Sequence, residues 1–399
     1  MTGDQFSGDR LQDWIRRCAL PDPASSTRSE VHAELRVRGI DVSAVVSRIV
    51  NAVVPSMPDR LAAARNARRG VLDRMSRIRQ STTTVSTELR GVLDNEPTYS
   101  AYFRKLEQVA SPEDRHSLAE DVKCLEILDD EDGLGLHFDS AQALWDACNF
   151  VEPSQLVVED IALALGVVVI EGPLTSADAW LVRRGHHGII RVSQSIPEPG
   201  RKRFAVLHEL AHWLWHAHMS QFVACTRDEM RSMYKRSQPE TAANTFAADM
   251  LMPERQFRER MGGTYLSWNA VRGISEFFGA TLTATAIRYV DLSTSPCAFV
   301  VTKDAKIKSY RSSQAFKNLY YLKSGSSISR ETGAFALAGN SQHAEMELTV
   351  PAKSWVARAS ASETPLMEES IRMDDYGIVA TLLRTQDHEA GPDQSITRR

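Results

Sequence analysis

The stretch from Arg203 to His216 constrains the fold and chemistry of this chain more than any other. It reads RFAVLHELAHWLWH and contains the pattern His-Glu-x-x-His. On a helix, His208 and His212 lie one turn apart on the same face, so both imidazoles can reach one metal ion. Glu209 lies beside that face, where its carboxylate can accept a proton from a water molecule without binding the metal. Because most neighbouring side chains are apolar, the sequence predicts a buried helix with a few polar groups aimed at one point.

Two imidazoles do not complete a catalytic zinc site, which needs three protein ligands and an open position. His218 follows His208 at a spacing that requires a sharp turn of the chain, and Trp215 stands where glycine would allow that turn. His216 lies two turns from His208, about 12 Å along the helix axis, which is too far to share one ion. The third ligand is therefore expected elsewhere.

A second helix is predicted downstream, in the stretch from Glu240 to Pro253. It is rich in alanine, has an apolar face, and is followed by a proline that cannot continue it. Glu240 and Asn244 are four residues apart and share one face. An antiparallel helix that carries Glu240 toward the two histidines would complete a site of two histidines and one glutamate.

The two stretches together resemble the ImmA/IrrE family of zinc metallopeptidases. The resemblance is carried by Phe-x-x-x-His-Glu-x-x-His, which begins at Phe204, and by Glu-x-x-Ala-Asn-x-Phe-Ala-Ala-x-x-Leu-Met-Pro, which begins at Glu240. It covers residues 145–293, and a fainter likeness to a family sensor region follows residue 297. Residues 1–140 show no motif of the family.

The resemblance implies a role for each site residue. His208, His212 and Glu240 match the Zn²⁺ ligands, and Glu209 matches the general base. Asn244 is expected to hold a ligand or a helix end through a hydrogen bond. An asparagine that only packs between helices is the competing interpretation. Tyr234 and Tyr265 are alternative donors to the tetrahedral intermediate, and the sequence does not choose between them.

The composition is that of a soluble globular protein. The chain has 399 residues, 43% hydrophobic and 25% charged, which predicts two or three domains. A net charge of −4 gives no case for general nucleic-acid affinity. No apolar run reaches the roughly 20 residues of a membrane span, and the N-terminus lacks a signal-peptide pattern, so we expect a cytoplasmic protein.

The five cysteines are scattered and none forms a CxxC pair, which is typical of reduced thiols. Cys225 lies between the two predicted metal-binding helices. It is interpreted as a partly buried thiol, with a zinc-capping thiolate in a latent state as the alternative.

The predicted fold class is α+β, with four segments. Residues 1–140 form a helical N-terminal region, and 141–293 form a mostly helical zincin-like core of the gluzincin type with a small mixed sheet. Residues 297–385 form an α+β sensor domain similar to a GAF domain, and 386–399 form a disordered tail. Within the core, Ile189–Ser193 is expected to be an edge strand that pairs with the substrate.

Two further segments allow more than one interpretation. A helix from Pro58 to Arg79 carries seven arginines against two aspartates, which suits an acidic or nucleic-acid partner, although a solvated helix or a coiled-coil arm is favoured. After Cys297, strands are expected at 298–302, 307–310, 334–337, 345–350 and 377–383. Trp355, Glu368 and Glu369 could line a pocket, but the favoured interpretation places Trp355 in the core and the two glutamates on the surface.

The resulting hypothesis is a zinc endopeptidase that cleaves one partner protein, a helix-turn-helix repressor or an antitoxin, in a stress, phage or defence response. A nucleic acid is considered as the activating signal, and no membrane partner is expected. Two alternatives remain: a catalytically silent fold that regulates by binding protein or DNA, and a general cytosolic peptidase. An intact Glu209 favours an enzyme, and the extra domains favour narrow, regulated cleavage.

Overall fold

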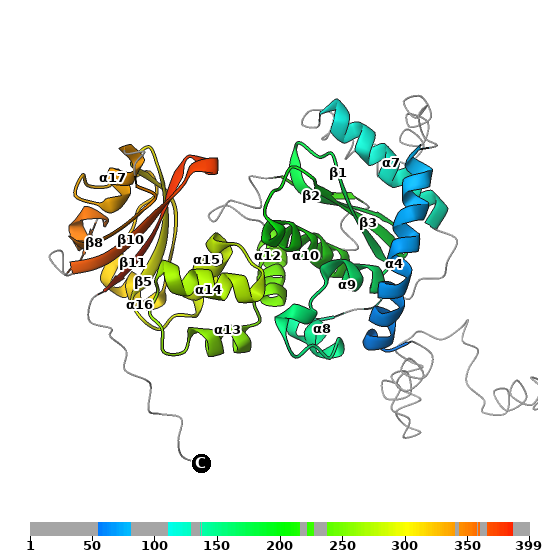
Figure 1. The fold of residues 1–399 in the computed structure, drawn as a ribbon, viewed down its shortest axis with the longest axis horizontal. Coiled ribbons are helices and arrows are strands. Elements are labelled where there is room, and N and C mark those ends of the chain that lie inside the picture. The colour runs from blue at the N-terminus through cyan, green and yellow to red at the C-terminus, as the bar shows by residue number, and fades with distance from the viewer. Residues whose placement is uncertain are drawn as a thin grey trace, which may run out of the picture. The chain divides into compact units, whose positions relative to one another are not determined.

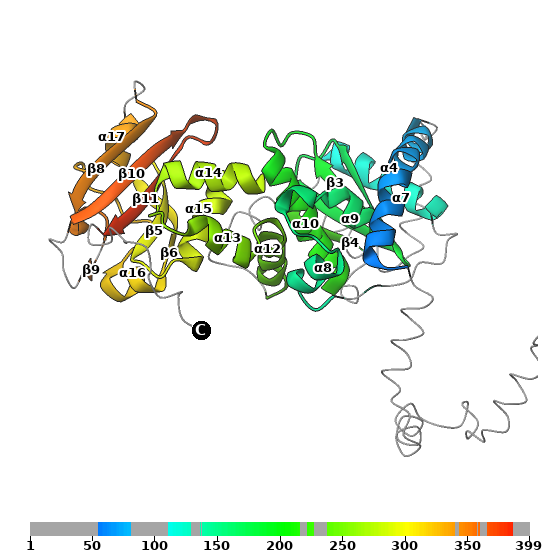
Figure 2. The same ribbon diagram turned by 60° about the horizontal axis from the view of Figure 1, so that its bottom comes forward.

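The computed structural model describes residues 55–80, 111–128, 136, 138–215, 222–226, 238–339, 343–356, 358–359 and 365–385. Contacts divide the chain into residues 1–60 and residues 61–399. In the first unit the described part is the start of helix α4 (Met57–Gln80), where the Asp59 N–H donates to Ser56 Oγ over 3.4 Å. The other elements belong to the second unit (Figures 1 and 2). Predictions for residues 1–54, 81–110 and 386–399 fall outside the described residues.

Four strands form a mixed sheet in the predicted peptidase region. They are β1 (Val167–Gly172), β2 (Ala177–Arg184), β3 (His187–Ser193) and β4 (Phe222–Thr226). Their spatial order is β1-β3-β2-β4, with β1 parallel to β3 and β2 antiparallel to both β3 and β4. β2 and β3 form a hairpin, and Gly185 in its turn has a φ of 53°, which favours glycine.

The expectation that Ile189–Ser193 is an edge strand is wrong. This segment belongs to β3, which pairs with β1 on one side and with β2 on the other. The outer edge of β2 is covered by β4, which comes from the segment between the helix that carries His208 and the helix that carries Glu240. Residue periodicity indicates the two faces of a strand but not its neighbours, which are set by chain segments far away in sequence.

Helices cover both faces of this sheet (Figure 1). α9 (Val158–Ala164) and α10 (Pro199–Trp215) lie on one face, and α7 (Pro112–Leu128) contacts β2 and β3 from the other. Under α7 lies an apolar cluster that includes Met75, Leu118, Val122, Leu125, Trp180, Val182 and Ile189. The core therefore continues across residue 141, where the sequence suggested a domain boundary.

A buried ion pair joins α7 to the sheet. Arg191 of β3 donates from Nη2 to Asp121 Oδ1 over 2.6 Å and from Nε to Asp121 Oδ2 over 2.9 Å. Trp180 Nε1 donates to the same Oδ2 over 2.9 Å, and Glu120 Oε2 accepts from Arg191 Nη2 over 3.1 Å. Burial acts to lower the pKa of Arg191, but the Asp121 and Glu120 carboxylates raise it above its ordinary value. The guanidinium is therefore charged although its side chain is only 1% exposed.

The predicted basic helix is α4, and two of its arginines contact the peptidase region. Arg65 Nε lies 3.2 Å from Asp160 Oδ2, and Arg68 Nη1 lies 2.9 Å from Asp160 Oδ1. Asp160, on α9, is buried. These contacts favour a structural role for Arg65 and Arg68 within the chain over a role in binding a partner.

Further helical elements complete the described part of this region. They are α8 (Ala141–Ala147), the 3-10 turn η1 (Pro153–Gln155), α12 (Gln238–Leu251), α13 (Glu254–Met261), α14 (Trp268–Phe278) and α15 (Leu282–Leu292). The Ser267 and Thr281 side chains accept hydrogen bonds from the first turns of α14 and α15, as N-caps do. Gly279, with a φ of 59°, ends α14.

Residues 297–385 contain an antiparallel sheet of order β6-β5-β11-β10-β8. Its strands are β5 (Cys297–Lys303), β6 (Lys306–Ser312), β8 (Glu345–Pro351), β10 (Pro365–Met373) and β11 (Ile378–Thr385). The smaller elements are α16 (Gln314–Leu319), β7 (Tyr320–Tyr321), α17 (Gly333–Gly339), η2 (Ala352–Ser354), β9 (Arg358–Ala359) and η3 (Asp374–Tyr376). The whole is an α+β protein, as predicted, and the likeness of this part to a GAF domain stays a prediction.

Two expectations for this part are wrong. Residues Ala334–Leu337 lie in helix α17 and not in a strand. Glu368, expected on the surface, is fully buried, and its Oε1 accepts from the Ala334 N–H over 2.7 Å and from Ser370 Oγ over 2.9 Å. Its Oε2 accepts from Nε1 of Trp355, which is buried as expected, over 2.9 Å. Burial outweighs these hydrogen bonds and raises the pKa of Glu368.

The described helices are too short or too polar to span a lipid bilayer. None of them combines the length and the apolar character that a membrane crossing requires.

Candidate metal centre

Helix α10 carries the His-Glu-x-x-His pattern on a face that is shut off from solvent. His208 and Glu209 are 0% exposed and His212 is 2% exposed. Near the start of the helix, Arg203 Nη1 donates to the Phe278 carbonyl over 2.9 Å, and at its end Trp215 Nε1 donates to the Phe138 carbonyl over 2.7 Å. These hydrogen bonds hold both ends of the helix against its surroundings.

Strand β2 is fastened to α10 at two points. Arg183 Nη2 donates to the backbone carbonyls of His212, over 3.2 Å, and Trp213, over 2.7 Å. Toward the other end of β2, Asp178 accepts from Arg201 in the first turn of α10, over 2.7 Å at Oδ1 and 2.9 Å at Oδ2. The strand and the helix that bears the histidines therefore hold a fixed register.

Helix α12 brings Glu240 to the two histidines. Ala243 and Ala247 on α12 are fully buried, and small side chains allow two helices to approach closely. Phe246 contacts Trp215 of α10 edge to face, with ring centroids 5.0 Å apart. This packing places Glu240, in the first turn of α12, opposite the imidazoles.

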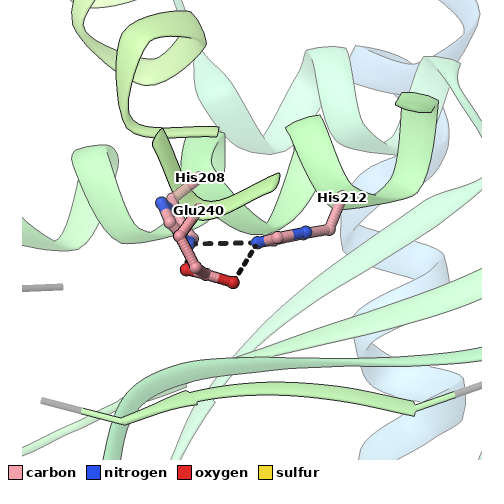
Figure 3. Close-up of side chains that lie close together, drawn as sticks. All are labelled: His208, His212 and Glu240. Atoms are coloured by element: carbon pink, nitrogen blue, oxygen red, sulfur yellow. Dashed lines mark hydrogen bonds and ion pairs between the residues drawn. The ribbon is translucent and has the colours of Figure 1, made fainter. Parts of the chain in front are cut away.

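The three side chains point toward one another (Figure 3). Nε2 of His208 lies 3.2 Å from Nε2 of His212 and 3.2 Å from Glu240 Oε2. Nε2 of His212 lies 3.4 Å from Glu240 Oε1. Each of the three offers one possible ligand atom, and these atoms all lie within 4.8 Å of one another. In the part of the chain that the structure describes, no other group of three histidine, cysteine or carboxylate side chains meets this condition.

This geometry fits a tetrahedral metal ion. Zinc bound at about 2.05 Å in a tetrahedral site separates its ligand atoms by about 3.3 Å. The three observed separations, 3.2, 3.2 and 3.4 Å, fall around that value. Two imidazoles and one carboxylate leave a fourth position open, which is the pattern of a catalytic zinc site.

The ionisation of the three side chains also favours a cation at this point. Burial acts to raise the pKa of the Glu240 carboxyl, but the hydrogen bonds and positive charge of His208 and His212 outweigh it and hold this pKa far below its usual range. Burial acts to lower the pKa of His212, but Glu240 and Glu209 raise it above its ordinary value. The carboxylates thus favour positive charge at this point, whether it is carried by protons or by a metal ion.

Other candidates from the sequence fall in different places. Asn244 Nδ2 donates to the backbone carbonyl of Glu240 over 2.8 Å, so it contacts the helix end that bears the ligand and not the Glu240 carboxylate. Tyr265 is 54% exposed and packs under the Arg384 guanidinium, 4.1 Å from the ring centroid. Cys225 lies on β4, and Tyr234 is outside the described residues.

Sequence reasoning missed the residues that position α10. Arg183, Asp178 and Arg201 are not among the predicted site residues, because charged residues at the ends of strands and helices are usually solvated. One signal was present: Asp178 interrupts an apolar strand, where an unpaired carboxylate would be costly. Its partner could not be found without the structure.

One family model matches the part of the chain that holds this centre. Residues 162–289 match the model of the peptidase M78 family, described as the IrrE N-terminal-like domain. No curated protein matches the chain. A solved structure titled Mycobacterium tuberculosis transcriptional regulator is similar over 61% of this chain and 74% of that chain, with 13% identity and a TM-score of 0.41.

The matched residues contain β1 to β4, helix α10 and Glu240 of α12, and so the whole candidate centre. The resemblance read from the two sequence motifs is confirmed by this match. Residues 162–289 form a peptidase domain of the ImmA/IrrE metallopeptidase family.

Proposed function

We propose that this chain is a zinc-dependent endopeptidase that cleaves one specific partner protein. The observation that carries the proposal is the convergence of three donor atoms from His208, His212 and Glu240 at separations of 3.2–3.4 Å in a buried site. Glu209, directly after the first histidine and equally buried, supplies the acid–base group that hydrolysis needs.

Zinc is the metal that this donor set favours. Imidazole nitrogen suits zinc better than the oxygen-preferring magnesium or calcium, and two histidines with one carboxylate are a known catalytic zinc set. When bound, zinc polarises a peptide carbonyl and lowers the pKa of a water molecule toward neutrality.

The residues of the chain carry the proton transfers. The Glu209 carboxylate accepts a proton as water attacks the peptide carbonyl carbon, and then donates it to the nitrogen of the departing amine. His208 and His212 are held by α10, and Glu240 by α12, so the packing of these two helices sets the geometry of the centre. Asn244 contributes by fixing the carbonyl of Glu240.

The proposed substrate is a helix-turn-helix repressor or an antitoxin, cleaved in the cytoplasm in a stress, phage or defence response. Support comes from the family resemblance and from the joining of the peptidase domain to a second α+β part in one chain. We propose that residues 297–385, as a GAF-like sensor, regulate cleavage, with a nucleic acid as one candidate signal.

Co-expression with the candidate repressor tests the proposal. Glu209→Gln should slow cleavage by about 10²–10⁴-fold, because general acid–base catalysis of this kind contributes that much. Glu276→Gln, an exposed residue of α14 with the same change of charge, is the matched control and should cleave as the wild type does. Equal cleavage by the Glu209 variant and the wild type would remove Glu209 from the mechanism. Relief of repression without cleavage would favour the binding-module alternative.

A further inference from the structure

Strand β4 occupies the outer edge of β2. It comes from the segment between the two helices that bear the metal ligands, and it pairs with β2 in antiparallel fashion. The paired residues are Val182 with Phe222, Leu181 with Val223, Trp180 with Ala224, Ala179 with Cys225, and Ala177 with Thr226. Because the other edge of β2 is paired with β3, β2 has room for one strand at this edge and no more.

That edge has a fixed relation to the candidate metal centre. Arg183 ties β2 to the backbone of His212, and Asp178 ties it to Arg201 in the first turn of α10. Figure 3 shows strands of the sheet running past His208, His212 and Glu240. An extended chain paired along the outer edge of β2 would therefore keep one register relative to the metal helix.

An extended polypeptide binds to a sheet by pairing its backbone with the N–H and C=O groups of an edge strand. At β2 these groups face β4. We infer that β4 is a resident occupant of the substrate-docking edge, so that a substrate must displace β4 before its peptide bond reaches the metal centre. This inference rests on the proposed function. It adds that β4 competes with the substrate for the edge of β2.

The pairing of β4 has features of a displaceable strand. It is five residues long, and its register with β2 shifts between Ala177 and Ala179. By contrast, β2 and β3 pair over six consecutive residues without a shift. Short, irregular edge strands give up their partners more readily than long regular ones.

The sequence of the edge indicates the chemistry of the competing segment. The β2 positions paired with β4 are Ala179, Trp180, Leu181 and Val182, all apolar, and β4 itself reads Phe-Val-Ala-Cys-Thr. Apolar and β-branched residues pair favourably across antiparallel strands. The docking edge therefore fits an extended apolar segment, which a folded partner exposes only after local unfolding.

A reversible crosslink tests the placement of β4 without any metal. Ala179 and Cys225 are direct cross-strand partners. Opposite residues of an antiparallel pair lie about 4.5–5.5 Å apart at Cα, within the range that a disulfide spans. Mild oxidation of the metal-free Ala179→Cys protein should link residues 179 and 225, detected by mass spectrometry of the joined peptides. Ala179→Cys/Cys225→Ser is the control that cannot form this link. Failure of the link to form would show that β4 does not rest on β2.

Binding of a probe tests the competition. The probe is a leucine-containing tripeptide hydroxamate, titrated into zinc-loaded protein by calorimetry. If the edge is open in about one molecule in ten, Ala224→Pro, which weakens the pairing of β4, should bind about tenfold more tightly than Ala224→Val. The oxidised Ala179→Cys protein should bind at least tenfold more weakly than the same protein after reduction.

The outcomes separate this inference from the proposed function. If the protein binds zinc, and its oxidised and reduced forms bind the hydroxamate with equal affinity, the inference alone is overturned. The same holds if zinc binds but even Ala224→Pro does not bind the hydroxamate, because a released edge should accept the probe. If the wild type does not bind zinc, or binds it no more tightly than a Glu240→Ala variant, the proposed function is overturned, and the inference falls with it.

Discussion

Replacing Asp121 with alanine should destabilise the peptidase domain by about 3–4 kcal/mol. Breaking a buried ion pair by removing one partner costs about 3–5 kcal/mol, because the remaining charge is left in a dry site. Arg191, 1% exposed, is in that position. The Trp180 N–H would also lose its acceptor, which adds about 1–3 kcal/mol. Glu120 Oε2, 3.1 Å from Arg191 Nη2, offsets part of the first cost, so the net loss is placed at about 3–4 kcal/mol, below the simple sum of about 4–8 kcal/mol.

Urea unfolding followed by tryptophan fluorescence measures this change. Glu120→Ala is the matched control, and since the Glu120 side chain is 17% exposed, its loss should cost about 1 kcal/mol. The double variant Asp121→Leu/Arg191→Met should recover most of the lost stability, because no charge is then stranded. A cost below about 1 kcal/mol for Asp121→Ala, or a double variant as unstable as the single one, would refute the reasoning.

Three other predictions concern metal, pH and the N-terminal helix. Zinc at 100 times its Kd should stabilise the wild type by about 2.7 kcal/mol over protein treated with a chelator, and Glu240→Ala should lose this difference in urea unfolding. Since burial raises the pKa of Glu368, its contribution to stability is complete below the unfolded pKa of about 4.3 and is lost as pH rises through the folded pKa. Between about pH 4 and 8, the free energy of unfolding measured with urea should therefore fall less steeply with rising pH for Glu368→Gln than for the wild type. Asp160→Ala should cost about 1 kcal/mol, because its arginine partners are 40–63% exposed, and a neutral effect would show that α4 is held by apolar contacts alone.

The convergence of His208, His212 and Glu240 could be predicted because the information for it is local. His208 and His212 are one helical turn apart, and Glu240 stands at the start of a second helix whose alanines allow close packing. A helix fixes the relative direction of residues three and four apart, so spacing alone says which side chains can converge. The structure added the distances, and the roles of the three residues stay predictions until metal binding is measured.

The partners of the strands could not be predicted in the same way. β3 has the apolar run of a buried strand, and this pattern is compatible with an edge or an interior place in the sheet. β4 was missed because five residues in a polar, methionine-containing segment carry little periodicity. Residues Ala334–Leu337 were mistaken for a strand because a short apolar run does not distinguish a strand from one turn of helix.

Glu368 shows a related limit. Two adjacent glutamates indicate a surface, since ionised side chains are rarely buried without partners. The partners exist here, but they come from Trp355, Ser370 and the backbone of α17, and they converge only in the folded sheet.

The apolar cluster beneath α7 bears on how the domain that carries His208 and His212 can be produced in isolation. An excised fragment beginning at residue 141 would leave Trp180, Val182 and Ile189 without the side chains that cover them. It would also remove Asp121, the carboxylate that pairs with the buried guanidinium of Arg191. Such a fragment should be insoluble or associate with itself. A fragment that starts ahead of Met57 keeps both covering helices and is the one to express.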